Sequence, residues 1–127
     1  MGYESKVTIV LRKMDADEIA KNLLSTCNKK LTDVFSRIGT LKSPDETYVC
    51  LQTDWTKWYK YFPEVDLIIN YIKDVRHSYI RCGEDCGDMD FSVKEQDEDG
   101  TDEEFRYLIE PFIDIRGVDQ FDFDYVE

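Results

Sequence analysis

The chain has 127 residues, of which 42% are hydrophobic and 13% aromatic, a composition that excludes a disordered protein and predicts one compact domain over residues 1–127. Its net charge of −12 is concentrated at one end, because residues 84–127 hold 17 acidic and 3 basic side chains, whereas residues 1–83 hold 11 acidic and 13 basic ones. The resulting charge of −14 over the last third disfavours direct binding to nucleic acid or to membrane headgroups and favours protein partners with basic clefts. Because the chain has no apolar run of about 18 residues and no hydrophobic leader, we expect a cytoplasmic protein.

The N-terminal part predicts a strand followed by one long helix. Residues 6–12 alternate with the two-residue period of a strand. Apolar residues then recur every three or four positions from Ile19 to Ile38, which is typical of one amphipathic helix. Asp15 and Glu18 predict a capping box at its start, and Gly39 is expected to end it.

Shorter elements are predicted for the rest of the chain. They are a turn over 41–46, a strand over 47–53, a helix over 63–74, two strands over 79–82 and 89–93, and further alternation from Phe105 to Ile115. This order predicts an α+β fold, with one antiparallel sheet and one long and one short helix packed on one face.

The cysteines and the single histidine do not form a recognisable metal motif. Cys27 and Cys50 stand at apolar positions, whereas Cys82 and Cys86 lie in a glycine-rich turn. A zinc site would need two more ligands at their own close spacing, and His77 alone does not supply them. We therefore expect four free thiols, a structural histidine, and no metal or cofactor.

An aromatic cluster over residues 55–62 has two interpretations. Large rings can form part of the core, since each buries much apolar area, or they can be anchors of an interface. The sequence leaves both open for the cluster, which comprises Trp55, Trp58, Tyr59, Tyr61 and Phe62.

The C-terminal sequence FDFDYVE alternates rings with carboxylates. As an edge strand it would turn its rings to the protein and its carboxylates to solvent, and as a flexible tail it would be a recognition segment for a basic, apolar groove. Alternate residues of a strand stand about 6.8 Å apart, and one DNA strand rises about 3.4 Å per nucleotide. A row of alternating Asp residues therefore partly imitates a nucleic-acid backbone.

Two stretches resemble small uncharacterised bacteriophage and prophage proteins. One is the opening MGYESKV, and the other is a pattern made by Trp58, Pro63-Glu64-Val65, Tyr79-Ile80-Arg81, Gly83-Glu84-Asp85 and Asp88. The resemblance implies a phage origin and a small intracellular protein, in the manner of anti-defence (anti-CRISPR-like) proteins. It implies no catalytic residues.

Together, these features predict an acidic inhibitor of a host nucleic-acid-handling protein, such as a CRISPR effector, a restriction enzyme or a polymerase, acting in the host cytoplasm. The predicted partner-binding residues are Asp97, Glu98, Asp99, Asp102, Glu103, Glu104, Tyr107, Asp114, Asp119, Phe121, Asp122, Phe123, Asp124 and Tyr125. One alternative is a small metal-dependent enzyme that uses the 83–90 turn, with Asp88, Asp90 and Lys94 near a metal. Another is a structural or assembly protein of a virion. The oligomeric state is left open.

Overall fold

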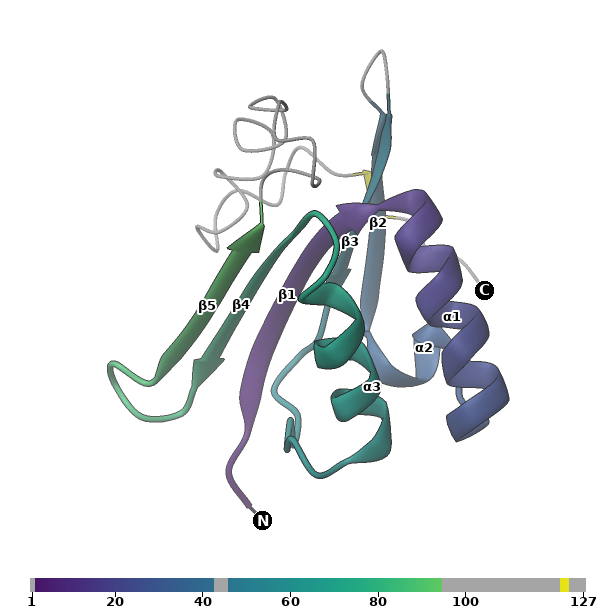
Figure 1. The fold of residues 1–127 in the computed structure, drawn as a ribbon. Coiled ribbons are helices and arrows are strands. Elements are labelled where there is room, and N and C mark those ends of the chain that lie inside the picture. The colour runs from purple at the N-terminus through teal and green to yellow at the C-terminus, as the bar shows by residue number, and fades with distance from the viewer. Residues whose placement is uncertain (1, 43–45, 95–121, 124–127) are drawn as a thin grey trace.

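An antiparallel sheet with helices packed on one face forms the fold in the computed structural model, which describes residues 2–42, 46–94 and 122–123 (Figure 1). The elements are, in chain order, β1 (Ser5–Arg12), α1 (Lys13–Cys27), α2 (Leu31–Val34), β2 (Arg37–Lys42), β3 (Thr47–Gln52), α3 (Pro63–Ile72), β4 (His77–Gly83), β5 (Met89–Lys94) and β6 (Asp122–Phe123). The strands lie in the order β5–β4–β1–β3–β2–β6, and β6 is only two residues long. The predicted α+β class, with a long and a shorter helix against an antiparallel sheet, is confirmed.

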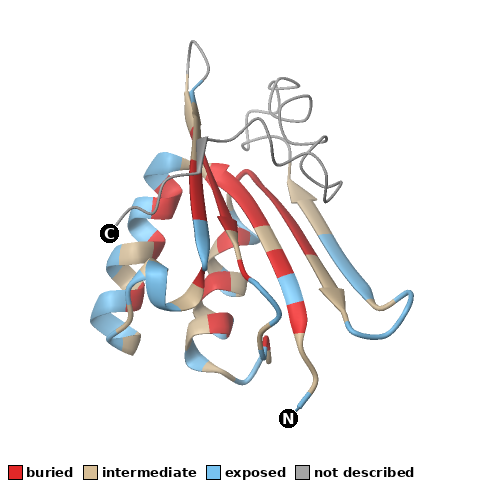
Figure 2. Cartoon of the chain, turned by 180° about the vertical axis from the view of Figure 1, so that it is seen from behind, coloured by how far each residue is buried: buried red, intermediate tan, exposed pale blue. Residues whose placement is uncertain are grey.

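The core lies between the sheet and the two longer helices. β1 occupies the centre of the sheet, paired with β4 on one side and β3 on the other. Its alternate residues Val7, Ile9 and Leu11 belong to the buried cluster, to which α1 contributes Ile19 and α3 contributes Ile68. Figure 2 shows buried residues along the central strands and on the sheet-facing sides of the helices. The apolar face of β1, which repeats every two residues, therefore packs against the apolar faces of α1 and α3, which repeat with the helical period.

The single long helix expected up to Ile38 is wrong. α1 ends at Cys27, because Asn28 adopts a left-handed conformation (φ 53°) and its N–H bonds the carbonyl of Leu23. The short α2 follows, and the chain then enters β2, where Ile38 pairs with Leu51 of β3. Gly39 is a strand residue, so it does not end a helix.

The expected capping box at Asp15 is also wrong. α1 begins at Lys13, directly after β1, with Arg12 as the capping position and no side-chain cap hydrogen bond. Asp15 is buried in the first turn, where its carboxylate accepts hydrogen bonds from Arg12 Nε at 3.0 Å and from the Tyr71 hydroxyl at 3.1 Å. Asp15 therefore joins the first turn of α1 to the end of β1 and to α3, and it does not cap the helix.

The other predicted elements agree with the structure within a few residues. The strands predicted over 6–12, 47–53, 79–82 and 89–93 are β1, β3, β4 and β5, and the helix predicted over 63–74 is α3. Of the turn predicted over 41–46, Leu41 and Lys42 belong to β2, and residues 43–45 lie outside the described part. The alternation from Phe105 to Ile115 also lies outside it. No helix among the described residues is long and apolar enough to cross a membrane.

Candidate functional site

Most of the predicted partner-binding residues lie outside the part of the chain that the structure describes. These are Asp97, Glu98, Asp99, Asp102, Glu103, Glu104, Tyr107, Asp114, Asp119, Phe121, Asp124 and Tyr125. Asp122 and Phe123 form β6, whose backbone pairs antiparallel with Thr40 and Gly39 of β2. These two residues therefore lie in a strand at the sheet edge, and the binding role of the whole set stays a prediction.

The β4–β5 hairpin carries an ion-pair cluster around Arg81. This guanidinium bonds Asp88 Oδ1 at 2.6 Å through Nη2 and Asp90 Oδ2 at 2.7 Å through Nε. A third bond runs from Nη1 to Ser5 Oγ of β1 at 2.9 Å. Hydrogen bonds to the two carboxylates, with that of Asp88 the stronger, raise the pKa of Arg81 above its ordinary value. One guanidinium thus ties the two sides of the hairpin to the central strand.

Tyr3 fastens the N-terminal segment to the same cluster. Its hydroxyl donates to Asp88 Oδ2 and accepts the backbone N–H of Asp85 at 3.0 Å. The pKa of Asp88 is lowered by the hydrogen bonds that it accepts, mainly from Arg81 and also from Tyr3. The hydrogen bond to Asp88 in turn raises the pKa of Tyr3. The carboxylate is therefore held in its charged form at neutral pH.

Gly83 leaves the space that this cluster occupies. A Cβ atom there would meet the Asp88 carboxylate and the Tyr3 hydroxyl too closely for either to stay in place. The sequence offers a weak signal for this, since Gly83 begins the Gly-Glu-Asp-Cys-Gly turn, but nothing in it points to Tyr3, which lies 85 positions before Asp88.

The geometry does not assemble the enzyme site that Asp88, Asp90 and Lys94 would form. Both carboxylates are engaged by Arg81, and Lys94 stands four residues beyond Asp90 on β5, a rise of about 13 Å. Its Nζ bonds the carbonyl oxygen of Asp74 at 3.3 Å. Across the described residues, no three His, Cys, Asp or Glu side chains are grouped closely enough to hold a metal ion.

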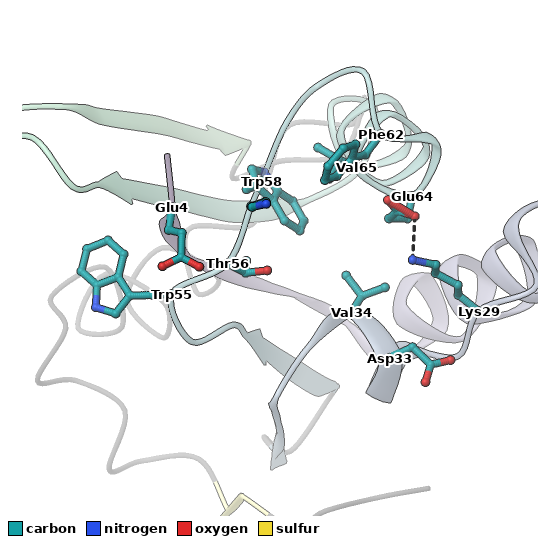
Figure 3. Close-up of a pocket in the computed structure, with 11 residues that line it drawn as sticks. Glu4, Lys29, Asp33, Val34, Trp55, Thr56, Trp58, Phe62, Glu64 and Val65 are labelled. Atoms are coloured by element: carbon teal, nitrogen blue, oxygen red, sulfur yellow. Dashed lines mark ion pairs between the residues drawn. The ribbon is translucent and has the colours of Figure 1, made fainter. Parts of the chain in front are cut away.

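Some residues of the aromatic cluster belong to the core and others are exposed. Trp55, Trp58 and Phe62 of this cluster line the cleft shown in Figure 3. Trp58 is buried: its indole N–H donates to the Tyr79 hydroxyl at 3.1 Å, and its ring lies 6.1 Å from that of Phe35. Trp55 is 46% exposed, with Lys6 Nζ 5.5 Å from its ring, and Tyr61 is 78% exposed. The sequence could not separate these roles, because the two tryptophans stand only three positions apart.

The cleft between the two tryptophans and α3 has a volume of about 360 Å³ and walls of mixed charge. Trp55 lies at one end, and the ion pair between Lys29 and Glu64, 3.1 Å long, lies at the other (Figure 3). Glu4 and Asp33 add carboxylates along the walls. Two lysines line the cleft, Lys29 and Lys57, and Lys29 is already paired with Glu64.

His77 is a structural residue. It is buried, with Nδ1 2.8 Å from the carbonyl oxygen of Val75 and Nε2 2.8 Å from Ser92 Oγ. Donation from Nδ1–H to the carbonyl leaves Nε2 to accept the serine hydroxyl, so the neutral ring satisfies both bonds. Burial lowers the pKa of His77.

The four cysteines are free thiols in different environments. Cys50 is buried in β3, and burial raises its pKa to about 12, whereas Cys86 is exposed in the hairpin turn. Cys27 and Cys82 are half-buried. The exposed thiol is therefore the accessible one for solvent reagents.

We find no match to the chain among protein-family models, curated proteins or solved structures. The resemblance to phage proteins therefore depends on the quoted residues alone.

Proposed function

We propose that the protein is a phage-type acidic protein that binds a host nucleic-acid-handling protein and inhibits it by occupying its basic groove. The observation that carries this proposal is the charge of −14 over residues 84–127, set against 11 acidic and 13 basic residues before them. A field of that strength attracts basic surfaces from a distance and accelerates encounter with them. A CRISPR effector, a restriction enzyme or a polymerase presents such a surface, since each must hold a phosphate backbone.

The hairpin supports the proposal because it exposes carboxylates at its tip. Glu84 and Asp85 are exposed at the tip of the β4–β5 hairpin, whereas Asp88 and Asp90 are engaged by Arg81. Glu84 Oε2 accepts the backbone N–H of Glu4, so a partner can meet the exposed Asp85 carboxylate and the second oxygen of Glu84. The two inner carboxylates maintain the hairpin.

The sheet also supports the proposal, because it fixes the positions at which the acidic part of the chain leaves it and returns to it. Residue 84 follows β4, next to the β5 edge, and β6 joins the sheet beyond β2, at the opposite edge. The acidic part thus starts at one edge of the sheet and returns at the other. Its carboxylates, including those of Asp97, Asp99 and Asp102, would engage the basic groove, with Tyr107 and Tyr125 as apolar anchors.

The enzyme alternative has less support, because the carboxylates it requires have another role. Asp88 and Asp90 compensate the charge of Arg81, and releasing them would leave that guanidinium without its two strongest partners. Under the proposal, Asp88→Ala affects the hairpin and not the target interface, so it should reduce stability and leave inhibition of a well-folded sample unchanged.

The test is a tagged pulldown from a bacterial lysate, eluted by a salt gradient, followed by competition between the chain and nucleic acid for the captured protein. We expect a nucleic-acid-binding protein that elutes at moderate salt, because contacts between charged surfaces weaken as ions screen them. We also expect the chain to displace labelled DNA or RNA from it. An empty eluate, or a partner that stays bound at molar salt, would contradict the electrostatic mechanism, and copurification with virus particles would favour the virion alternative.

A further inference from the structure

The outer side of β5 is an unpaired sheet edge among the described residues. β5 pairs with β4 along its whole length and ends the strand order on that side. Its outer backbone N–H and C=O groups therefore face away from the sheet, which makes such an edge a template for pairing with another strand.

The side chains of β5 divide cleanly between the two faces of the sheet. Ser92 pairs with Tyr79, which belongs to the core beneath the helices, so Asp90, Ser92 and Lys94 lie on the helix side. Met89, Phe91 and Val93 lie on the other face, where Met89 is 57% and Phe91 59% exposed. Two large apolar side chains side by side on a free edge favour burial against a partner.

We propose that this edge binds the β5 edge of a second copy of the chain, antiparallel and centred on Ser92. In this register Asp90 stands opposite the partner's Lys94, and Phe91 stands opposite the partner's Val93. Because the interface is symmetric, each pair occurs twice. Opposite charges then meet on the helix side and apolar side chains meet on the other side, the two kinds of cross-strand pair that stabilise antiparallel sheets.

Neighbouring symmetric registers are less complementary. A pairing centred on Asp90 places two Asp90 carboxylates directly opposite each other. A pairing centred on Phe91 places Asp90 opposite Ser92 and Lys94 opposite Asp88, which precedes β5 and whose carboxylate is already engaged by Arg81 and Tyr3. Charge complementarity therefore favours the register centred on Ser92.

The carboxylate and the ammonium group are both placed to make this contact. Arg81 engages only Oδ2 of Asp90, whose side chain is 53% exposed, so Oδ1 can accept a bond from the partner. Among the described residues, Lys94 bonds the backbone oxygen of Asp74, and an ammonium group carries three donors in all. The two pairs can therefore form without breaking the contacts within each copy.

The test is the molar mass of the full chain by light scattering or sedimentation, from micromolar to millimolar concentration at physiological salt. We expect a concentration-dependent dimer. Lys94→Asp places two carboxylates opposite each other twice and should raise the dimer dissociation constant at least about tenfold. Lys73→Asp is the matched control, with the same charge change at an exposed lysine just after α3, and should have little effect.

Two more variants test the register and the apolar pair. The double variant Asp90→Lys with Lys94→Asp reverses both charges and should recover the association that Lys94→Asp loses. Phe91→Thr should weaken the dimer, whereas Tyr61→Thr, at an exposed ring away from β5, should not. A chain that stays monomeric at millimolar concentration overturns the proposal, as do equal effects of Lys94→Asp and Lys73→Asp, or no recovery in a correctly folded double variant.

Discussion

Removing the Tyr79 hydroxyl should destabilise the fold through Trp58. This hydroxyl accepts the indole N–H of Trp58 at 3.1 Å, and both side chains are buried at 7% exposure. Tyr79→Phe keeps the ring and removes the acceptor, which leaves a buried N–H without a partner at a cost of about 1–3 kcal/mol. The matched control is Tyr61→Phe, since that hydroxyl belongs to a side chain that is 78% exposed and its loss should change stability by less than about 0.5 kcal/mol.

The assay is urea unfolding followed by circular dichroism. Tyr79→Phe should lower the midpoint at unchanged slope, because the hydrogen bond is lost without a change in the surface exposed on unfolding. In a Trp58→Phe background the donor is already gone, so the same substitution should cost much less. Equal midpoints for Tyr79→Phe and Tyr61→Phe, or the same cost of Tyr79→Phe in both backgrounds, would refute this account of the pair.

Three further predictions follow from the hairpin, the thiols and the buried histidine. Gly83→Ala should lower the free energy of unfolding by about 1–3 kcal/mol, since its methyl group displaces the Asp88 carboxylate; an unchanged urea midpoint would contradict the contact. Cys86 should react with a thiol reagent at mildly alkaline pH much faster than Cys50, whose pKa burial raises to about 12, and peptide mass spectrometry showing equal labelling would contradict the described burial. Burial lowers the pKa of His77 below its ordinary value of 6.5, so as the pH falls the unfolded chain takes up the proton first. The free energy of unfolding should therefore fall as the pH drops below 6.5. A His77→Gln variant with the same pH dependence of stability from pH 7.5 to 5 would exclude the histidine as the cause.

Elements with a strong local pattern could be predicted from the sequence. Residues 6–12 alternate because β1 packs one face against the helices, and Pro63 fixes the start of α3 because its ring suits the first helical position. The β4–β5 hairpin follows from two short strand patterns around a glycine-rich turn.

The start of β2 could not be predicted in this way, because its decisive contact is not local. Phe35 and Ile38 stand three positions apart, which agrees with a helix as well as with a turn that leads into a strand. The pairing of Ile38 with Leu51 decides between them, and no spacing within the segment reveals it. Asn28, which ends α1, was a local signal of the correct boundary.

For the candidate sites, too, local sequence features could be predicted and contacts between distant residues could not. The sequence located the acidic third of the chain, since charge is a property of composition. It could not show that Arg81 holds Asp88 and Asp90, or that Trp58 is buried while Trp55 is exposed, because these outcomes depend on which strands become neighbours.

The most direct test of the central claim is one pulldown that compares three forms of the chain under the same salt gradient. The first is the natural sequence. The second has six carboxylates neutralised by Asp97→Asn, Glu98→Gln, Asp99→Asn, Asp102→Asn, Glu103→Gln and Glu104→Gln. The third is a control with Glu18→Gln, Asp54→Asn and Asp74→Asn, at exposed positions in the first part of the chain. We expect the natural chain and the control to capture the same nucleic-acid-binding protein and the neutralised chain to lose it. Capture that survives in the neutralised chain at the same salt concentration would contradict the claim.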